Sequence, residues 1–194
     1  MRFRNFIAAL AAAAAIAACS QKDPAQEAID AAADALNAVY EDAQKYVPER
    51  YAEAKAELDA ARKAFDEERY PEAIAAVKDV PAKAEALAKE AAAAKEKHLA
   101  ELDADWKRLS ATLPDRFTGI GTRLDELGRM KKLPDGMDRQ LLDEAKAALA
   151  SAQSAWQEAG ALQAKGELEA AVGKGRDAEG MAQDLVGRLG MPAA

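Results

Sequence analysis

The sequence predicts an all-α protein, an elongated antiparallel helical bundle, on three observations. Of its 194 residues, 52 are Ala and only 5% are aromatic, whereas strands favour β-branched and aromatic side chains. Apolar residues recur at the three- and four-residue spacing of a helix face through most of the chain. One stretch of this pattern occurs twice. The bundle is therefore expected to contain two related helical hairpins and a middle helical section.

Residues 1–18 predict a signal peptide. Arg2 and Arg4 form a short basic region, and an uncharged run of 13 mostly Ala residues, Phe6 to Ala18, follows. A membrane-spanning helix needs about 20 apolar residues, so this run is too short to remain as a span. It has the length and flanking charge of a secretory signal.

The four residues Ile16-Ala17-Ala18-Cys19 resemble the bacterial lipobox, in which the Cys becomes the mature N-terminus and its thiol takes a diacylglycerol. Cys19 is the only Cys of the chain, so it is predicted to be the lipid attachment site. Two or three acyl chains give stable membrane anchoring. The alternative is a plain signal peptide with an incidental Cys. Ser20 follows the Cys, and by resemblance to the sorting rule of enteric bacteria it favours the outer membrane, facing the periplasm, over the inner membrane.

The helical domain is expected to cover residues 23–190, after a short lipid-proximal linker at 19–22. Asp23-Pro24 has the pattern of a helix start, with Asp as the N-cap and Pro at the first helical position. The apolar face of this first helix is expected to contain Ile29, Leu36, Val39 and Tyr40.

The first hairpin is predicted at about 48–94 and begins at Pro48. Tyr70-Pro71 marks the turn into its second helix, and Pro81 is expected to kink or divide that helix. The inward-facing residues of the two helices are Tyr51, Ala54, Leu58, Ala61, Phe65, Ile74, Val77, Val80, Ala84 and Leu87.

The second hairpin is predicted at about 138–189. Its first helix matches that of the first hairpin at a constant offset of 91, and its second helix matches at an offset of 97, where Glu169-Ala170 aligns with Glu72-Ala73. Its inward-facing residues are Leu142, Ala145, Leu149, Ala152, Trp156, Leu168, Val172, Met181, Leu185 and Leu189.

The middle section is expected to contain two helices. Leu113-Pro114 and Leu133-Pro134-Asp135-Gly136 are its clearest breaks. The expected apolar faces of these helices are Leu99, Leu102, Trp106, Leu109 and Leu113, and then Phe117, Ile120, Leu124 and Leu127.

Because Ala buries little area, stability is expected to depend on a few large residues. The core residues predicted to matter most are Tyr51, Leu58, Phe65, Trp106, Leu149 and Trp156.

The sequence offers no catalytic, metal-binding or cofactor-binding set, so the protein is predicted not to be an enzyme. His98 is the only His, and Lys95 occupies the position that an acidic ligand would need for a di-iron bundle. A haem held by His98 and a Met is a weak alternative to a solvated His. The net charge of −7 at pH 7 argues against a nucleic-acid partner, because phosphates require a basic face.

Ala61, Ala64, Tyr70, Ala73 and Ile74 resemble part of the tetratricopeptide pattern. Together with the lipobox and Tyr46-Val47-Pro48, they make the chain similar to alanine-rich periplasmic lipoproteins of Gram-negative bacteria that carry a helical-hairpin domain of unknown function. The resemblance covers most of residues 19–190. It implies a location and an architecture but no catalytic residue.

Two functions remain open from the sequence. The first is a non-enzymatic, lipid-anchored periplasmic protein that acts as a scaffold, spacer or partner-binding module in the cell envelope. The second is a helical bundle that binds a small apolar ligand or a lipid between its helices. Heptad-like faces could pack within one chain or between copies, so a homo-oligomer is also possible.

Overall fold

The computed structural model describes the backbone of residues 3–192 and the side chains of residues 21–192. This part of the chain contains seven helices and no strand, which confirms the all-α prediction. The side chains of the predicted signal peptide and of Cys19 are not among those that the structure describes. The helices are α1 (Phe3–Ala38), α2 (Tyr40–Tyr46), α3 (Pro48–Asp66), α4 (Tyr70–Val77), α5 (Val80–Arg129), α6 (Arg139–Ala164) and α7 (Leu168–Arg188).

The chain is divided into two compact units, Met1–Lys97 (unit 1) and His98–Ala194 (unit 2). Helix α5 contributes its first part to unit 1 and the rest to unit 2. Among the described side chains, each unit has its own cluster of buried apolar residues, and the two clusters share no member. The expected single domain 23–190 is therefore two units, each with a separate core.

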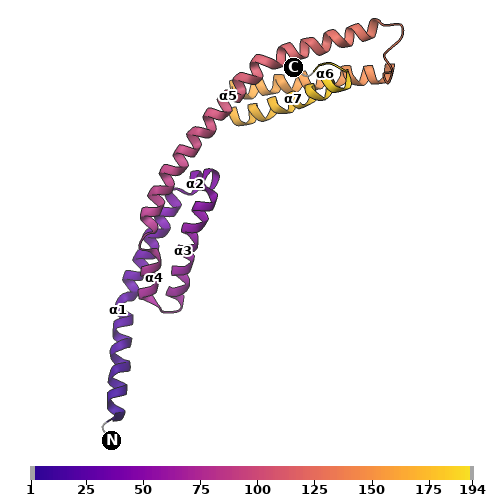
Figure 1. Ribbon diagram of the computed structural model, residues 1–194. Helices are drawn as coiled ribbons and strands as arrows, with labels where there is room; N and C mark the ends of the chain where they lie inside the picture. The colour runs from indigo at the N-terminus through magenta and orange to yellow at the C-terminus, as the bar shows by residue number, and fades with distance from the viewer. Residues whose placement is uncertain (1–2, 193–194) are drawn as a thin grey trace. The chain divides into compact units, whose positions relative to one another are not determined.

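Unit 1 is a three-helix arrangement, in which α1 and α3 lie beside a third helix formed by α4 and the first part of α5 (Figure 1). Helices α3 and α4 form an antiparallel hairpin, and the short α2 leads from α1 into α3. Half of the sixteen core residues are Ala. The larger ones are Ile29, Leu36, Tyr51, Leu58, Tyr70, Val77, Val80 and Leu87.

Unit 2 repeats this arrangement with the second part of α5, α6 and α7. Its core cluster is richer in large side chains, because only four of the sixteen buried residues in the cluster are Ala. The larger ones are Leu102, Leu109, Leu113, Phe117, Ile120, Leu124, Leu127, Leu142, Leu149, Val172, Leu185 and Leu189.

The two units bury equivalent faces. Ile29 and Leu36 of α1 correspond to Phe117 and Leu124 of α5, at a constant separation of 88 residues. The helices after the hairpin turns correspond at a separation of 98, which pairs Ala73 with Ala171, Ala84 with Ala182 and Leu87 with Leu185. The offset of 97 inferred from the sequence was thus wrong by one residue. The middle section is not a separate joining element, because it supplies the first helix of unit 2.

Both hairpins turn in the same way. The Arg69 N–H donates to the Ala64 carbonyl over 2.8 Å, and the Glu167 N–H donates to the Leu162 carbonyl over 3.0 Å. Each bond spans five residues and closes around a residue with positive φ, which is Glu68 (60°) in the first turn and Gly166 (83°) in the second. This is the Schellman ending of a helix, in which the left-handed residue is usually Gly. Helix α6, with 26 residues, is longer than the 19-residue α3 by two turns, so its buried face stays in register.

Of three prolines that are expected at helix boundaries, one lies at a boundary and two lie inside helices. Pro81 lies in the first turn of α5, and α4 ends before it at Val77, so the expected division is present. Pro114 was expected to break the chain but lies inside α5. Pro24 was expected to begin a helix but lies inside α1. Both internal prolines are on the exposed face, where water can satisfy the carbonyl that loses its helical partner.

The expected break at 133–136 is present, as the loop between α5 and α6. The Asp138 carboxylate caps α6 by accepting from the Leu141 N–H over 2.7 Å. The Arg139 guanidinium donates to the carbonyls of Gly128 (3.1 Å) and Met130 (2.7 Å) at the end of α5. One short segment thus satisfies backbone groups at the ends of both helices.

Three residues expected on apolar faces are exposed instead. Tyr40 is 46% exposed, Leu99 46% and Met181 41%. Tyr40 begins α2, where the chain turns away from the buried face of α1. Leu99 lies between the two cores, and Met181 lies between the buried positions Ala178 and Ala182 on the outer side of α7. Periodicity identified the helices, but it did not locate the ends of each buried face.

Helix α7 packs closely against its neighbours at Gly175. A Cβ atom at this position would lie 2.9 Å from Cδ1 of Leu109 and 3.3 Å from Cζ3 of Trp156. Leu109 is fully buried and therefore has little room to move. The absence of a side chain at Gly175 lets α7 approach both α5 and α6.

We expect Gly175→Val to destabilise unit 2 by about 1–3 kcal/mol, because the added atoms overpack this contact. Both Trp residues of the chain lie in unit 2, so thermal unfolding followed by Trp fluorescence measures the change in this unit. Gly173→Val is the matched control, because Gly173 lies on the exposed face of the same helix with no neighbour near its Cβ position. Equal melting temperatures for the two variants would contradict the close packing.

Glu68 and Gly166 occupy the same positive-φ position in the two turns. Substituting each residue by the other is expected to change stability in opposite directions. Glu68→Gly should stabilise unit 1 and Gly166→Glu should destabilise unit 2, each by about 1 kcal/mol, because a side chain is strained at positive φ. Far-UV circular dichroism follows both units, and Trp fluorescence follows unit 2 alone. A destabilised Glu68→Gly variant would show that the Glu68 side chain contributes more than its backbone strain costs.

Candidate functional site

The predicted lipid attachment site directly precedes the folded core. Cys19 lies outside the described side chains, and Ala25 is the first buried residue among those that are described, followed by Ile29. Asp23 does not begin a helix as expected, because α1 continues through it from the Ala-rich residues before it. Only five residues therefore separate Cys19 from the buried face of α1.

The six large residues predicted for the core all contact it, but to different extents. Tyr51 and Leu58 are buried in unit 1, and Leu149 is buried in unit 2. Phe65 is half-buried and makes an edge-to-face contact with Tyr70, with ring centroids 5.3 Å apart. Trp106 and Trp156 are half-buried and stack on each other at 5.0 Å, at the edge of the unit 2 core.

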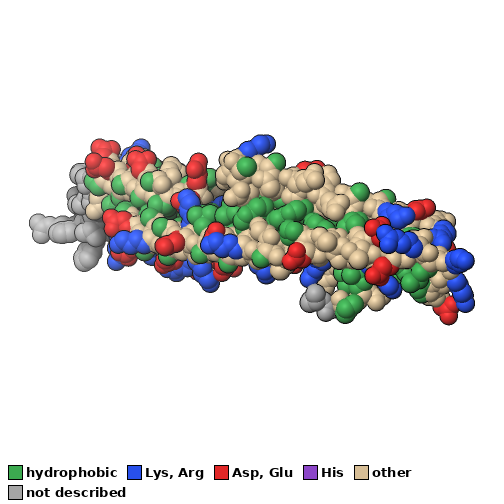
Figure 2. Space-filling view, turned by 90° about the horizontal axis from the view of Figure 1, so that it is seen from above, with side chains coloured by type: hydrophobic (Ala, Val, Ile, Leu, Met, Phe, Trp, Pro, Cys, Tyr) green, Lys and Arg blue, Asp and Glu red, His purple; other side chains and the backbone are tan. Residues whose placement is uncertain are grey.

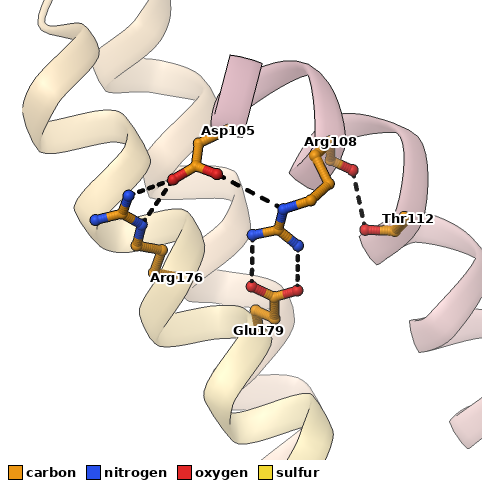
Figure 3. A network of polar contacts seen from close by, with 5 residues as sticks. All are labelled: Asp105, Arg108, Thr112, Arg176 and Glu179. Carbon is orange, nitrogen blue, oxygen red and sulfur yellow. Dashed lines mark hydrogen bonds and ion pairs between the residues drawn. The ribbon is translucent and has the colours of Figure 1, made fainter. Parts of the chain in front are cut away.

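An ionic network joins α5 to α7 beside this Trp pair (Figure 3). Arg108 binds Glu179 through two parallel hydrogen bonds of 2.5 and 2.9 Å. Asp105 accepts from Arg176, whose Nε lies 3.1 Å away, and also lies 3.7 Å from Arg108. Two-point guanidinium–carboxylate contacts fix the relative position of the groups that they join. The network therefore sets the register of α7 along α5.

A charge pattern in the sequence corresponds to this network, although the sequence alone did not lead us to expect the network. Asp105 and Arg108 are three residues apart on α5, and Arg176 and Glu179 have the same spacing on α7 with the opposite order of charge. Both cross-helix pairs have a separation of 71 residues, as expected for parallel helices in register. His98 and Glu169 have this separation too, with Nε2 and Oε1 3.7 Å apart.

The network lowers the pKa values of its carboxylates. The hydrogen bond from Arg176 is the main cause that holds the pKa of Asp105 below its usual value. The hydrogen bond from Arg108 lowers the pKa of Glu179 in the same way, and Glu179 in turn raises the pKa of Arg108. The charged forms of both carboxylates are therefore favoured in the folded state.

Antiparallel helices are also joined by ion pairs along the edges of both cores. In unit 1, Arg50 pairs with Glu90 and Glu57 pairs with Lys83, both between α3 and α5. In unit 2, Glu158 pairs with Lys174 and Glu144 pairs with Arg188, between α6 and α7. Exposed pairs of this kind contribute little free energy each.

The described residues do not assemble a metal or catalytic site. No group of three His, Cys, Asp or Glu side chains among residues 21–192 is placed to hold a metal ion. His98, the residue considered for a haem, is placed beside Glu169. No described helix combines the length and apolarity needed to cross a membrane.

A largely apolar groove lies on the surface of unit 2, with a volume of about 560 Å³. It is lined by Ala111, Gly119, Val186, Met191 and Pro192 together with the polar residues Thr112, Asp115 and Arg116. The Met191 methyl group lies 3.9 Å from the Cβ position of Gly119 and so borders the groove at the end of α7. Elsewhere, acidic and basic side chains are interspersed over the face shown in Figure 2. This face is therefore neither predominantly acidic nor predominantly basic.

Comparison of the chain with protein-family models, with curated proteins and with solved structures finds no match.

The lowered pKa values of Asp105 and Glu179 predict that acid destabilises unit 2. Both groups bind protons more weakly in the folded than in the unfolded state, so their contribution to stability is present above their ordinary pKa values of 3.8 and 4.5. It is lost as the pH falls through the lower folded-state values. The double variant Arg108→Gln/Arg176→Gln removes the cause of both shifts.

The Trp-detected melting temperature should fall less in this variant than in the parent protein between about pH 6 and about pH 3. Lys146→Gln is a control, because Lys146 pairs only with Asp143 within its own helix. Identical pH profiles for the parent and the double variant would contradict the role of the network.

Proposed function

We propose that the protein is a non-enzymatic lipoprotein of the Gram-negative cell envelope, anchored through Cys19, whose helical body acts as a scaffold, spacer or partner-binding module. The observation that carries the proposal is the sequence Ile16–Cys19, which only five residues separate from Ala25, the first buried residue among the described side chains. A lipid on Cys19 would hold the folded unit 1 directly at the membrane surface, since no long tether separates them.

The membrane in this proposal is the outer membrane, with the helical body facing the periplasm. Support comes from Ser20, which takes the place of the Asp that retains lipoproteins at the inner membrane in enteric bacteria. The single Cys also suits an oxidising compartment, because acylation leaves no free thiol. The separation of inner and outer membranes by density tests this assignment.

A scaffold or spacer role is supported by the two cores. Each unit buries its apolar faces within itself, and charged residues outline both cores through pairs such as Arg50–Glu90 and Lys174–Glu158. A partner would therefore meet polar, closely packed helix faces. The alternative, a small apolar ligand bound between helices, requires a pocket that covers most of the ligand. The groove beside Met191 lies at the surface and does not favour that alternative.

We expect the isolated mature protein to begin at Cys19 and to carry the added mass of acyl chains on this residue. Cys19→Ser should abolish that added mass, because a hydroxyl does not replace the thiol as the lipid acceptor. Mass spectrometry of the intact protein and of its N-terminal peptide, after extraction of the membranes with detergent, measures both outcomes.

Ser20→Ala is the matched control, because it changes the adjacent residue and leaves the thiol in place. It should retain the acyl mass. A parent protein that keeps residues 1–18, or that carries a free thiol at Cys19 after membrane extraction, would refute the anchor.

Crosslinking in intact cells tests the partner-binding part of the proposal. The same envelope protein should be crosslinked in repeated experiments with the parent chain and lost with Cys19→Ser, because the anchor restricts the protein to one membrane. Repeated absence of any crosslinked partner would favour a spacer without a protein partner.

A further inference from the structure

Helix α5 contains a stretch without buried side chains between the two cores. Ala91 is the last buried residue on the unit 1 side, and Leu102 is the first on the unit 2 side. Every residue from 92 to 101, which we name the connector segment, is exposed or half-buried. The boundary between the units, at Lys97 and His98, lies within it. Elsewhere in α5, apolar residues that are buried or packed against a core recur every three or four positions.

The connector segment is helical because of its composition. Its sequence, AAAKEKHLAE, consists mainly of Ala, Lys and Glu, which are among the strongest helix formers. In isolation a helix of this length is marginal in water, because it has too few hydrogen bonds to offset the cost of nucleation. Its helical state therefore depends on the folded helix that continues it on both sides.

Polar contacts between exposed side chains tie the connector segment to each unit. The Lys95 ammonium binds the Asp42 carboxylate of unit 1 over 3.0 Å, and its Nζ lies 6.0 Å from the centre of the Tyr46 ring. His98 lies 3.7 Å from Glu169 of unit 2. Ion pairs with this degree of exposure contribute little or nothing to the free energy of folding, and salt screens them. They are contacts that a local opening can break.

We propose that the connector segment is a conformational joint, whose backbone hydrogen bonds open by local unfolding while both cores remain folded. Opening removes no side chain from either core, since the core positions of α5 end at Ala91 and resume at Leu102. Leu99, the largest apolar residue of the segment, is already 46% exposed in the folded state. Water can take over the released backbone groups, because every residue of the segment is exposed or half-buried.

Because of the joint, a force or a bound partner that unfolds one unit can leave the other unit folded. A helix held by packing along its whole length would transmit unfolding from one core to the other. The connector segment instead interrupts this packing for about three helical turns. This inference does not depend on the lipid anchor, so it can be tested on the purified chain of residues 19–194 with Cys19 replaced by Ser.

Hydrogen–deuterium exchange followed by mass spectrometry tests the joint. Amides of the connector segment should exchange faster than those of α5 at positions 84–91 and 109–127, by on the order of tenfold or more, because local opening suffices for them. Addition of about 0.5 M salt should increase this difference by screening the Lys95–Asp42 pair.

Ala93→Gly gives the sharper result, because Ala93 is exposed and Gly weakens the helix without removing a core contact. Exchange within the connector segment should accelerate roughly fivefold, and exchange in both cores should remain unchanged. Ala86→Gly is the matched control at an exposed position of α5 beside the unit 1 core. It should leave exchange of the connector segment unchanged.

Two results would overturn the proposal. Exchange of the connector segment at the rate of the adjacent core positions would show that the segment opens only with a core. Slow exchange that becomes faster on dilution would show that a second copy of the chain covers the segment. A parent-like exchange rate in Ala93→Gly would count against the proposal in the same way as the first result.

Discussion

The narrow buried face of each helix is the constraint on which the rest of the structure depends. Ala occupies many core positions, so helices must approach closely before their larger residues meet, and at Gly175 the approach leaves no room even for a Cβ atom. Close approach makes register critical, because a shift of one residue would place a charged side chain against the core. The ion pairs between α5 and α7, and those along α3 and α6, lie at the edges of these faces and oppose such a shift.

Much of this architecture could be predicted from the sequence, because helix periodicity and hairpin repetition are local signals. The helix starts at Pro48 and Tyr70 and the loop at 133–136 follow directly from them. The effects of Pro114 and Pro24 could not be predicted in the same way, since a proline ends a helix only when the freed carbonyl lacks a partner. That depends on which side of the helix faces water, and hence on the tertiary structure. The exposure of Tyr40 and Leu99 likewise depends on where each core ends.

The candidate site divides into a covalent part and a geometric part. Cys19 could be proposed as a lipid attachment site from four residues, because the lipobox that they resemble is a linear motif and needs no folded neighbour. The network of Asp105, Arg108, Arg176 and Glu179 could not be proposed from composition, since a chain with 34 acidic and 27 basic residues contains many candidate pairs. Its signal is the reversed charge order at equal spacing on two helices, and that signal acquires meaning only once α5 and α7 are known to be parallel neighbours.

The two cores differ in their content of Ala, and this difference affects how the two units unfold. Unit 1 has eight Ala among its sixteen core residues and unit 2 has four, so unit 2 buries more apolar area for the same number of core positions. In a helix packed along its whole length, the two cores would unfold together. Without buried side chains between Ala91 and Leu102, α5 carries no packing energy from one unit to the other. With the proposed joint, unit 1, which contains Cys19, can loosen while unit 2 keeps its Leu-rich core and the ionic network that fixes α7 on α5.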